Sequence, residues 1–134
     1  MKKLKCLVID DEELARTLLK TYIAEVDYLD LVGEFENPVH ALGKIKETNI
    51  DLIFLDIQMP ELKGTELAKI IGNETKIIFT TAYTEYALEG FNLNALDYLL
   101  KPITFSRFLE AVAKYKAQNI KEQATNETIT IKSG

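Results

Sequence analysis

Short apolar stretches alternate with segments of helical period along most of the chain. Three stretches of strand length, Leu4–Ile9, Asp51–Asp56 and Lys76–Thr80, are nearly continuous apolar runs. Runs of this kind are typical of interior strands that are buried on both faces of a sheet. Two weaker strand candidates are Leu31–Phe35 and Ala95–Leu99. The alternation predicts βαβ units wound around a parallel sheet.

Helical segments are predicted after each of these strands. They are the apolar stripe from Leu14 to Val26, then Pro38–Glu47, Glu66–Ile71, Thr84–Phe91 and a last helix capped by Thr104. The second has a clear start, because Asn37 is a favoured N-cap and proline is favoured at the first helical position. The fourth is weakly specified, because Gly90 lies inside it.

The length of the chain and its one cysteine limit what it can be. With 134 residues it has the size of one domain and is too short for two ordinary ones. Cys6 is the single cysteine, which excludes an internal disulfide and a multi-cysteine metal site. Because Cys6 lies in an apolar run, we predict that its thiol is buried and structural.

Charge and hydropathy argue against two classes of partner. The 16 Lys and Arg residues against 21 Asp and Glu give a net charge of −5, which opposes non-specific attraction to nucleic acid. The longest run without a charge, Ile77–Thr84, is far shorter than the roughly 20 apolar residues of a membrane helix. The basic start Met1–Lys5 resembles a signal peptide, but Asp10 interrupts the apolar stretch behind it. We expect a cytoplasmic chain with no membrane partner.

Charged and polar residues stand where the predicted strands end. The first strand runs into four consecutive acids, Asp10 to Glu13, and the third ends in Asp56. The fourth is followed by Thr81, and the fifth is followed closely by Lys101. Because ligands of an open parallel sheet bind beyond the carboxyl ends of its strands, we expect these groups to meet at one edge.

Each of these groups has a structural explanation when it is taken alone. Asp11 could cap the first helix, where the helix dipole favours the acids that follow it. Asp56 could cap a turn, although a carboxylate at the end of a buried strand is costly unless it has a partner. A lone threonine at a strand end is commonly structural, and a lone lysine is commonly solvated. Their conjunction at one edge favours a functional site.

The residue types at this edge suit phosphoryl transfer. Neighbouring carboxylates repel one another and have raised pKa values unless a cation lies among them. Carboxylate and carbonyl oxygens are the ligands that Mg²⁺ prefers. One aspartate can then act as a nucleophile toward phosphorus and form an aspartyl-phosphate. Lys101 and the Thr81 hydroxyl can supply the positive charge and the donor that the phosphoryl oxygens need.

Taken in order, these residues form a specific set of motifs. The set is Asp10-Asp11, then Asp56 with Met59-Pro60 and Gly64 behind it, then Thr81-Ala82, and last Asp97-Tyr98-Leu99-Leu100-Lys101-Pro102. It resembles the CheY-like receiver domain of two-component response regulators, over about residues 4–116. The stretches Phe79–Phe91 and Asn94–Leu99 further resemble the LytTR-type subgroup, whose members usually carry a C-terminal DNA-binding domain.

The resemblance implies a fold and a metal site. The fold is a doubly wound α/β domain of the flavodoxin and CheY type, with a five-stranded parallel sheet in the order 2-1-3-4-5. Asp56 would be the phosphoacceptor. Mg²⁺ would be held by Asp10, Asp11, Asp56 and the backbone carbonyl of Gln58.

The resemblance also implies a switch and its partners. Thr81 would be the switch hydroxyl, Tyr98 the aromatic side chain that follows it, and Lys101 the cation that pairs with the phosphoryl group across a cis Lys101-Pro102 bond. A sensor histidine kinase would supply the phosphoryl group. Phosphorylation would favour a homodimer through the fourth helix, fifth strand and fifth helix. Such a domain is a signalling switch that catalyses only its own phosphotransfer and dephosphorylation.

Other classes of protein fit the residues less well. A Mg²⁺-dependent phosphatase with an aspartate nucleophile, of the haloacid dehalogenase type, needs a second aspartate two residues later, where this chain has Gln58. A flavodoxin needs a donor-rich phosphate loop after the first strand, where this chain has four acids. A histidine-phosphotransfer protein would be helical, and His40 is most simply an ordinary side chain of the second helix.

The end of the chain differs in composition from the rest. We expect residues 1–118 to form the receiver domain, and residues 119–134 to be a linker and the start of a missing LytTR-type DNA-binding domain. Residues 117–127 are polar with no apolar stripe, and Thr128–Ile131 alternates like a strand and is similar to the opening strand of such a domain. We expect DNA binding only through that missing domain, which would regulate transcription.

Overall fold

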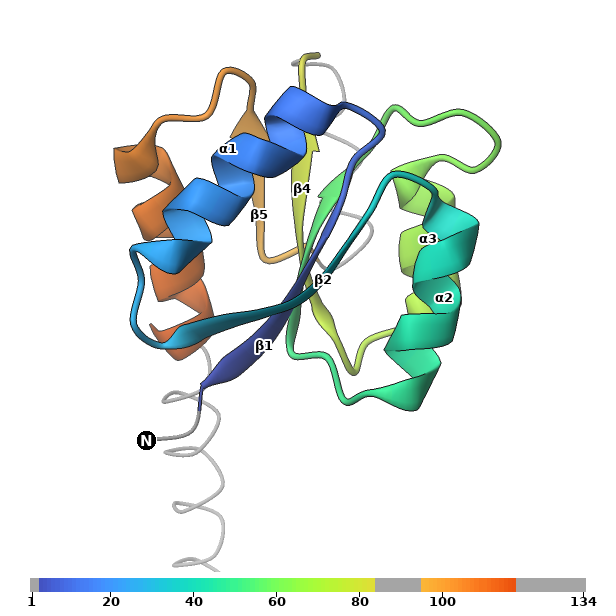
Figure 1. Cartoon of the computed structure of the whole chain (residues 1–134), viewed down its shortest axis with the longest axis horizontal. Coiled ribbons are helices and arrows are strands. Elements are labelled where there is room, and N and C mark those ends of the chain that lie inside the picture. The colour runs from blue at the N-terminus through green and yellow to red at the C-terminus, as the bar shows by residue number, and fades with distance from the viewer. Residues whose placement is uncertain (1–2, 84–94, 118–134) are drawn as a thin grey trace, which may run out of the picture.

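The computed structural model describes residues 3–83 and 95–117, and these form one sheet with helices on both faces (Figure 1). The strands are β1 (Leu4–Ile9), β2 (Leu29–Phe35), β3 (Leu52–Asp56), β4 (Lys76–Thr81) and β5 (Asp97–Leu100). They pair in the order β2-β1-β3-β4-β5, and every pairing is parallel. The predicted fold class and strand order are confirmed.

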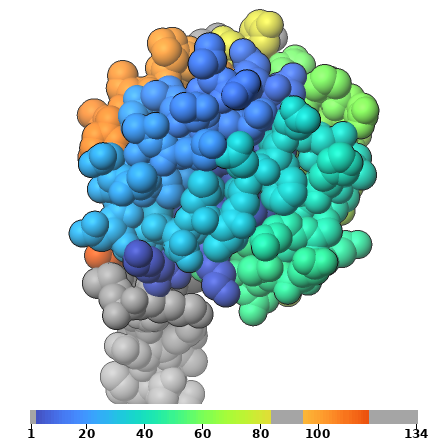
Figure 2. Space-filling model, in the orientation of Figure 1, coloured from blue at the N-terminus to red at the C-terminus, as the bar shows by residue number. Residues whose placement is uncertain are grey.

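Helices cover both faces of this sheet. In the described residues they are α1 (Glu13–Ala24), α2 (Pro38–Glu47), α3 (Gly64–Ile71) and a last helix over residues 105–117. Figure 1 places α2 and α3 together on one face, and α1 with the last helix on the other. In the space-filling view, α1 and the chain through β2 and α2 cover the side turned to the viewer (Figure 2).

The sheet divides the core in two, because alternate side chains of a strand point to opposite faces. Cys6 and Val8 of β1 belong to the cluster beneath α1 and the last helix, which includes Phe108. Leu7 belongs to the cluster beneath α2 and α3, which includes Leu67. Cys6 is buried, as predicted from the sequence, and burial raises the pKa of its thiol to about 12.

The edge strands differ most from their predicted bounds. β2 begins at Leu29, before the predicted Leu31, and β5 covers Asp97–Leu100 in place of Ala95–Leu99. Both strands lie at edges of the sheet and mix polar with apolar residues, so the hydrophobic pattern marks their ends weakly. The interior strands agree with their predicted bounds to within one residue.

Two predicted helix caps are confirmed, and a third interpretation is wrong. The Asn37 side chain accepts a hydrogen bond from the Val39 N–H at 2.8 Å, and Thr104 Oγ1 accepts one from the Arg107 N–H at 3.2 Å. The N-cap of α1 is Glu12, so helix capping does not account for Asp11.

Several expectations lie outside the described residues. They concern the fourth helix over Thr84–Phe91, the polar segment from residue 118 onward and the strand Thr128–Ile131. Within residues 3–83 and 95–117, no helix has the length and apolar character needed to cross a membrane.

Gly64 allows α3 to begin directly against the backbone at the end of β3. The helix begins at this residue, before the predicted Glu66, and the Gly64 N–H donates to the Ile57 carbonyl at 2.9 Å. A Cβ atom at Gly64 would lie 2.2 Å from the Asp56 carbonyl oxygen and 2.9 Å from the Ile57 Cα. Since both obstacles are backbone atoms, no side-chain rotation can relieve the clash.

We predict that Gly64→Ala destabilises the protein by about 1–3 kcal/mol, the usual cost of forcing extra atoms into a packed region. Gly43→Ala is the matched control, because a Cβ there meets nothing within 4 Å in the middle of α2. The control should gain about 0.5–1 kcal/mol, since alanine favours a helix over glycine. The free energy of unfolding of each variant, measured in guanidinium chloride, checks this, and equal effects of the two substitutions would contradict it.

Candidate functional site

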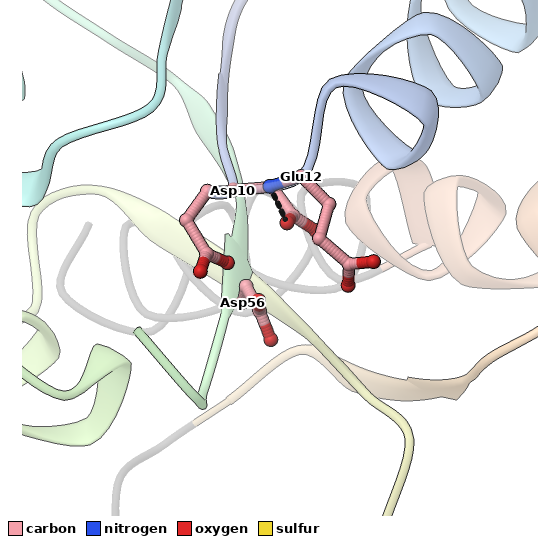
Figure 3. Close-up of side chains that lie close together, drawn as sticks. Asp10, Glu12 and Asp56 are labelled. Atoms are coloured by element: carbon pink, nitrogen blue, oxygen red, sulfur yellow. Dashed lines mark hydrogen bonds between the residues drawn. The ribbon is translucent and has the colours of Figure 1, made fainter. Parts of the chain in front are cut away.

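Four carboxylates gather at the carboxyl edge of the sheet. Asp10, Asp11 and Glu12 follow β1, and Asp56 ends β3, which is the neighbour of β1 in the sheet. One carboxylate oxygen from each residue lies within 4.8 Å of the others. Figure 3 shows Asp10, Glu12 and Asp56 together at this edge. Asp10 and Asp56 are buried, with 1% and 3% of their surface exposed, whereas Asp11 and Glu12 are exposed.

Backbone contacts hold the loop that carries the first three acids. The Asp10 N–H donates to the Phe35 carbonyl of β2 at 3.0 Å, and Asp10 Oδ1 accepts from the Glu12 N–H at 2.9 Å (Figure 3). Arg16 of α1 donates from Nη1 to the Asp10 carbonyl at 2.8 Å and from Nε to Glu34 of β2 at 3.4 Å. The loop is therefore tied both to the neighbouring strand and to its own helix.

Lys101 brings a positive charge into this cluster from the end of β5. Its Nζ lies 3.0 Å from Asp10 Oδ2, 3.4 Å from Glu12 Oε1 and 3.6 Å from Asp56 Oδ2. The Lys101 N–H donates to the Thr81 carbonyl at 2.7 Å, and the peptide bond to Pro102 is cis as expected. One ammonium group thus contacts three carboxylates.

The environment raises the pKa of Asp56 to about 7 from an ordinary value of 3.8. Burial is the largest cause, and repulsion from Asp10 adds to it. Lys101 and a hydrogen bond from the Gln58 N–H at 3.2 Å act in the opposite direction. Burial also lowers the pKa of Lys101, but its contacts with Asp10 outweigh this and hold that pKa above its ordinary value. The predicted repulsion among carboxylates is thus present at Asp56.

The two expected switch residues lie on neighbouring strands. Thr81 ends β4 and is buried, and its Oγ1 accepts a hydrogen bond from the Tyr83 N–H at 3.0 Å. Tyr98 of β5 pairs with Phe79 of β4 in the sheet, and their ring centroids lie 5.2 Å apart. Both strands lead to the edge that carries Asp56 and Lys101.

Two residues of this edge have no assigned role in the sequence analysis. Glu12 belongs to the run of acids expected here but not to the expected metal ligands, and its carboxylate joins the cluster and contacts Lys101. Arg16 supports the Asp10 loop, and nothing in the spacing of the sequence marks it. His40 borders a cavity of about 220 Å³ beside the site, together with Asp11, Glu36 and Glu61.

The donor set fits a hard divalent cation such as Mg²⁺. Such ions take oxygen ligands, often one or two carboxylates together with phosphate oxygens and water. Here carboxylate oxygens from four residues converge, and burial together with repulsion from Asp10 raises the pKa of Asp56. Asp10, Asp11 and Asp56 are residues that could hold the ion, and the structure adds Glu12 to them.

The model of the response regulator receiver domain family matches residues 6–113 of this chain. The chain belongs to this family. It is the receiver domain of a two-component response regulator, and the sheet order and the acidic edge are those expected from the resemblance in its motifs.

The curated relatives that this chain matches are longer proteins. An uncharacterised response regulatory protein of Vibrio cholerae is 41% identical over 120 residues, which are 88% of this chain and 51% of the relative. The transcriptional regulatory protein BtsR of Escherichia coli is 37% identical over 124 residues, or 91% and 52%. The sensory transduction protein LytT of Bacillus cereus is 39% identical over 129 residues, or 94% and 52%. The chain spans about half the length of these relatives.

A solved structure agrees with the fold of the receiver domain. The response regulatory domain of the protein mrkE from Klebsiella pneumoniae is 35% identical, with a TM-score of 0.79. The match covers 86% of this chain and 97% of that domain.

The likeness to LytT and BtsR supports the LytTR-type resemblance that the motifs indicated.

We predict that Asp56→Asn stabilises the receiver domain when divalent cations are removed, by about 1–3 kcal/mol, because the amide removes a buried charge that is poorly compensated. An acid whose pKa rises on folding opposes folding most strongly above its folded pKa. The gain should therefore be larger at pH 8 than at pH 5, since the pKa of Asp56 falls from about 7 to 3.8 on unfolding.

Asp10→Asn is the control for this prediction. It removes the carboxylate that lies nearest to the Lys101 ammonium, at 3.0 Å, so it should stabilise less or destabilise. Unfolding in guanidinium chloride with a chelator, at both pH values, measures each variant. A less stable Asp56→Asn variant at pH 8 would refute the electrostatic account of the site.

Proposed function

We propose that this receiver domain accepts a phosphoryl group on Asp56 from a sensor histidine kinase. The observation that carries the proposal is the position of Asp56, a buried carboxylate at the end of β3 beside Asp10 and Lys101. A carboxylate in this position can act as a nucleophile toward phosphorus and form an aspartyl-phosphate. The function is that of a signalling switch, and the only reactions it catalyses are its own phosphorylation and dephosphorylation.

The chemistry follows from the residues at the edge. An Asp56 oxygen attacks phosphorus, the new O–P bond forms as the P–N bond to the kinase histidine breaks, and the imidazole leaves. Mg²⁺, held by Asp10, Asp11, Asp56 and the backbone carbonyl of Gln58, would neutralise charge on the transferring oxygens. The Lys101 ammonium pairs with the phosphoryl group, and water later hydrolyses the acyl phosphate to regenerate the carboxylate.

The phosphoryl group acts on Thr81 and Tyr98. Its oxygens accept a hydrogen bond from the Thr81 hydroxyl, which draws that side chain toward Asp56. The movement of Thr81 then changes the packing around the Tyr98 ring, whose hydroxyl is buried in this structure. The contact between the Tyr98 and Phe79 rings supports this proposal, because Thr81 lies only two residues after Phe79 on β4.

The response serves transcription in a longer protein. We propose that residues 1–118 are the receiver domain and that residues 119–134 lead to a LytTR-type DNA-binding domain, in a cytoplasmic protein. The names and lengths of LytT and BtsR support this, since the chain covers 52% of each. The phosphorylated receiver domain would dimerise through the expected fourth helix (Thr84–Phe91), the fifth strand β5 and the fifth helix, which is the last helix over residues 105–117. Dimerisation would so pair two DNA-binding domains.

The central test is Mg²⁺-dependent phosphorylation of Asp56. Acetyl phosphate with Mg²⁺ should add one phosphoryl group per chain by intact mass, because the carboxylate cluster needs a cation before an anion can approach. Asp56→Ala should abolish the addition, and a chelator should suppress it. Asp30→Ala is the matched control, because Asp30 is an exposed aspartate of β2. Full labelling of Asp56→Ala would exclude Asp56 as the phosphoacceptor.

A second test concerns self-association. At matched concentration, light scattering should give the phosphorylated protein a higher average mass than the unmodified protein, because the switch changes the surface around β5. Asp56→Ala treated with acetyl phosphate should keep the mass of the unmodified protein. An unchanged mass after complete phosphorylation would refute dimerisation as the output.

A further inference from the structure

An ion pair between β5 and the last helix holds both backbone polar groups of Tyr98. The Tyr98 N–H donates to Asp97 Oδ1 at 2.7 Å, and the Tyr98 carbonyl accepts from Arg107 Nη2 at 3.1 Å. Arg107 also donates to both Asp97 oxygens, at 2.7 and 2.8 Å. β5 is the edge strand of the sheet, and backbone groups at an edge have no further strand to bond. At Tyr98 the ion pair takes that place.

The same helix holds Asp97 from a second position. Lys114, two turns after Arg107, lies 2.9 Å from Asp97 Oδ2, and the Asp97 side chain is only 8% exposed. Burial raises the pKa of Asp97, but the hydrogen bonds from Arg107 and Lys114 outweigh it and hold this pKa below its ordinary value. Bidentate arginine–carboxylate pairs are strong and geometrically specific. Asp97 and Arg107 therefore form a defined clamp rather than a loose surface pair.

The clamp lies next to the proposed switch. Three residues after Tyr98, the Lys101 N–H bonds the Thr81 carbonyl at 2.7 Å. The backbone from Tyr98 to Lys101 is thus fastened at one end to the last helix and at the other end to Thr81. The Arg107 guanidinium thus links this segment directly to the last helix.

We infer that Asp97 and Arg107 are positioning residues that fasten the backbone of Tyr98 to the last helix, so that a change at Thr81 and Tyr98 also changes that helix. This inference rests on the proposed function. It assigns to Arg107 a role that an ordinary exposed ion pair does not have, because such pairs add little stability and bond no backbone. It also requires the forked guanidinium, since a lysine ammonium is a point charge that cannot match this geometry.

Hydrogen exchange read by mass spectrometry, before and after complete phosphorylation by acetyl phosphate with Mg²⁺, tests the inference. In the wild type, we expect exchange to change both in peptides containing Tyr98 and in peptides from residues 105–117. In Arg107→Gln, phosphorylation of Asp56 should remain complete while the change in residues 105–117 is lost. Arg107→Lys keeps the charge and the fold but should lose the same change.

Lys116→Gln is the matched control, because it removes one charge from the same helix and its Nζ lies over the Tyr28 ring, 5.4 Å from the centroid. It should respond as the wild type does. If Arg107→Lys and Arg107→Gln still transmit the change to residues 105–117, or if the wild type changes only around Tyr98, the inference is wrong while the proposed function stands. If the wild type takes no phosphoryl group, the proposed function and the inference fail together.

Discussion

The ammonium group of Lys101 among the carboxylates is the interaction on which the functional edge depends. Two aspartates, Asp10 and Asp56, are buried side by side, and buried like charges are tolerated only with a partner of opposite charge. Lys101 supplies this positive charge from the end of β5. It lies 91 residues from Asp10 in sequence. Its placement requires β5 to pair with β4 in the observed register and its backbone to bond Thr81. The charge balance of the carboxylate site therefore depends on β5, the outermost strand of the sheet.

The positions of the carboxylates are set by backbone as much as by side chains. Gly64 lets α3 approach the Asp56 carbonyl more closely than any side chain would permit, which holds the turn after β3. Arg16 bonds the Asp10 carbonyl, and β2 accepts the Asp10 N–H. Because the loops after β1 and β3 are tied at their backbones, the acids stay together although burial and repulsion from Asp10 raise the pKa of Asp56.

The parts that the sequence predicted well are those with a local physical cause. Buried parallel strands need apolar residues on both faces, so β1, β3 and β4 were found as continuous runs. The convergence of Asp56, Thr81 and Lys101 followed from the common direction of parallel strands. The bounds of β2 and β5 were less accurate, because edge strands carry polar residues. Long side chains were missed, since Arg16 and Arg107 act on groups whose positions are set by the assembled fold.

The geometry of β5 suggests why the switch and the phosphoryl site are coupled at all. In the proposed function, a phosphoryl group on Asp56 competes with Asp10 for the Lys101 ammonium, which has a limited number of donors. Tyr98 lies in β5, and Lys101 follows directly after the end of this strand. The Lys101 N–H donates to the carbonyl of Thr81, the last residue of β4. A redistribution of charge at Lys101 and a movement of Thr81 therefore act on the same few residues. Because the Asp97–Arg107 clamp bonds the backbone N–H and carbonyl of Tyr98, the inferred response involves the Tyr98 ring and the helix that carries Arg107.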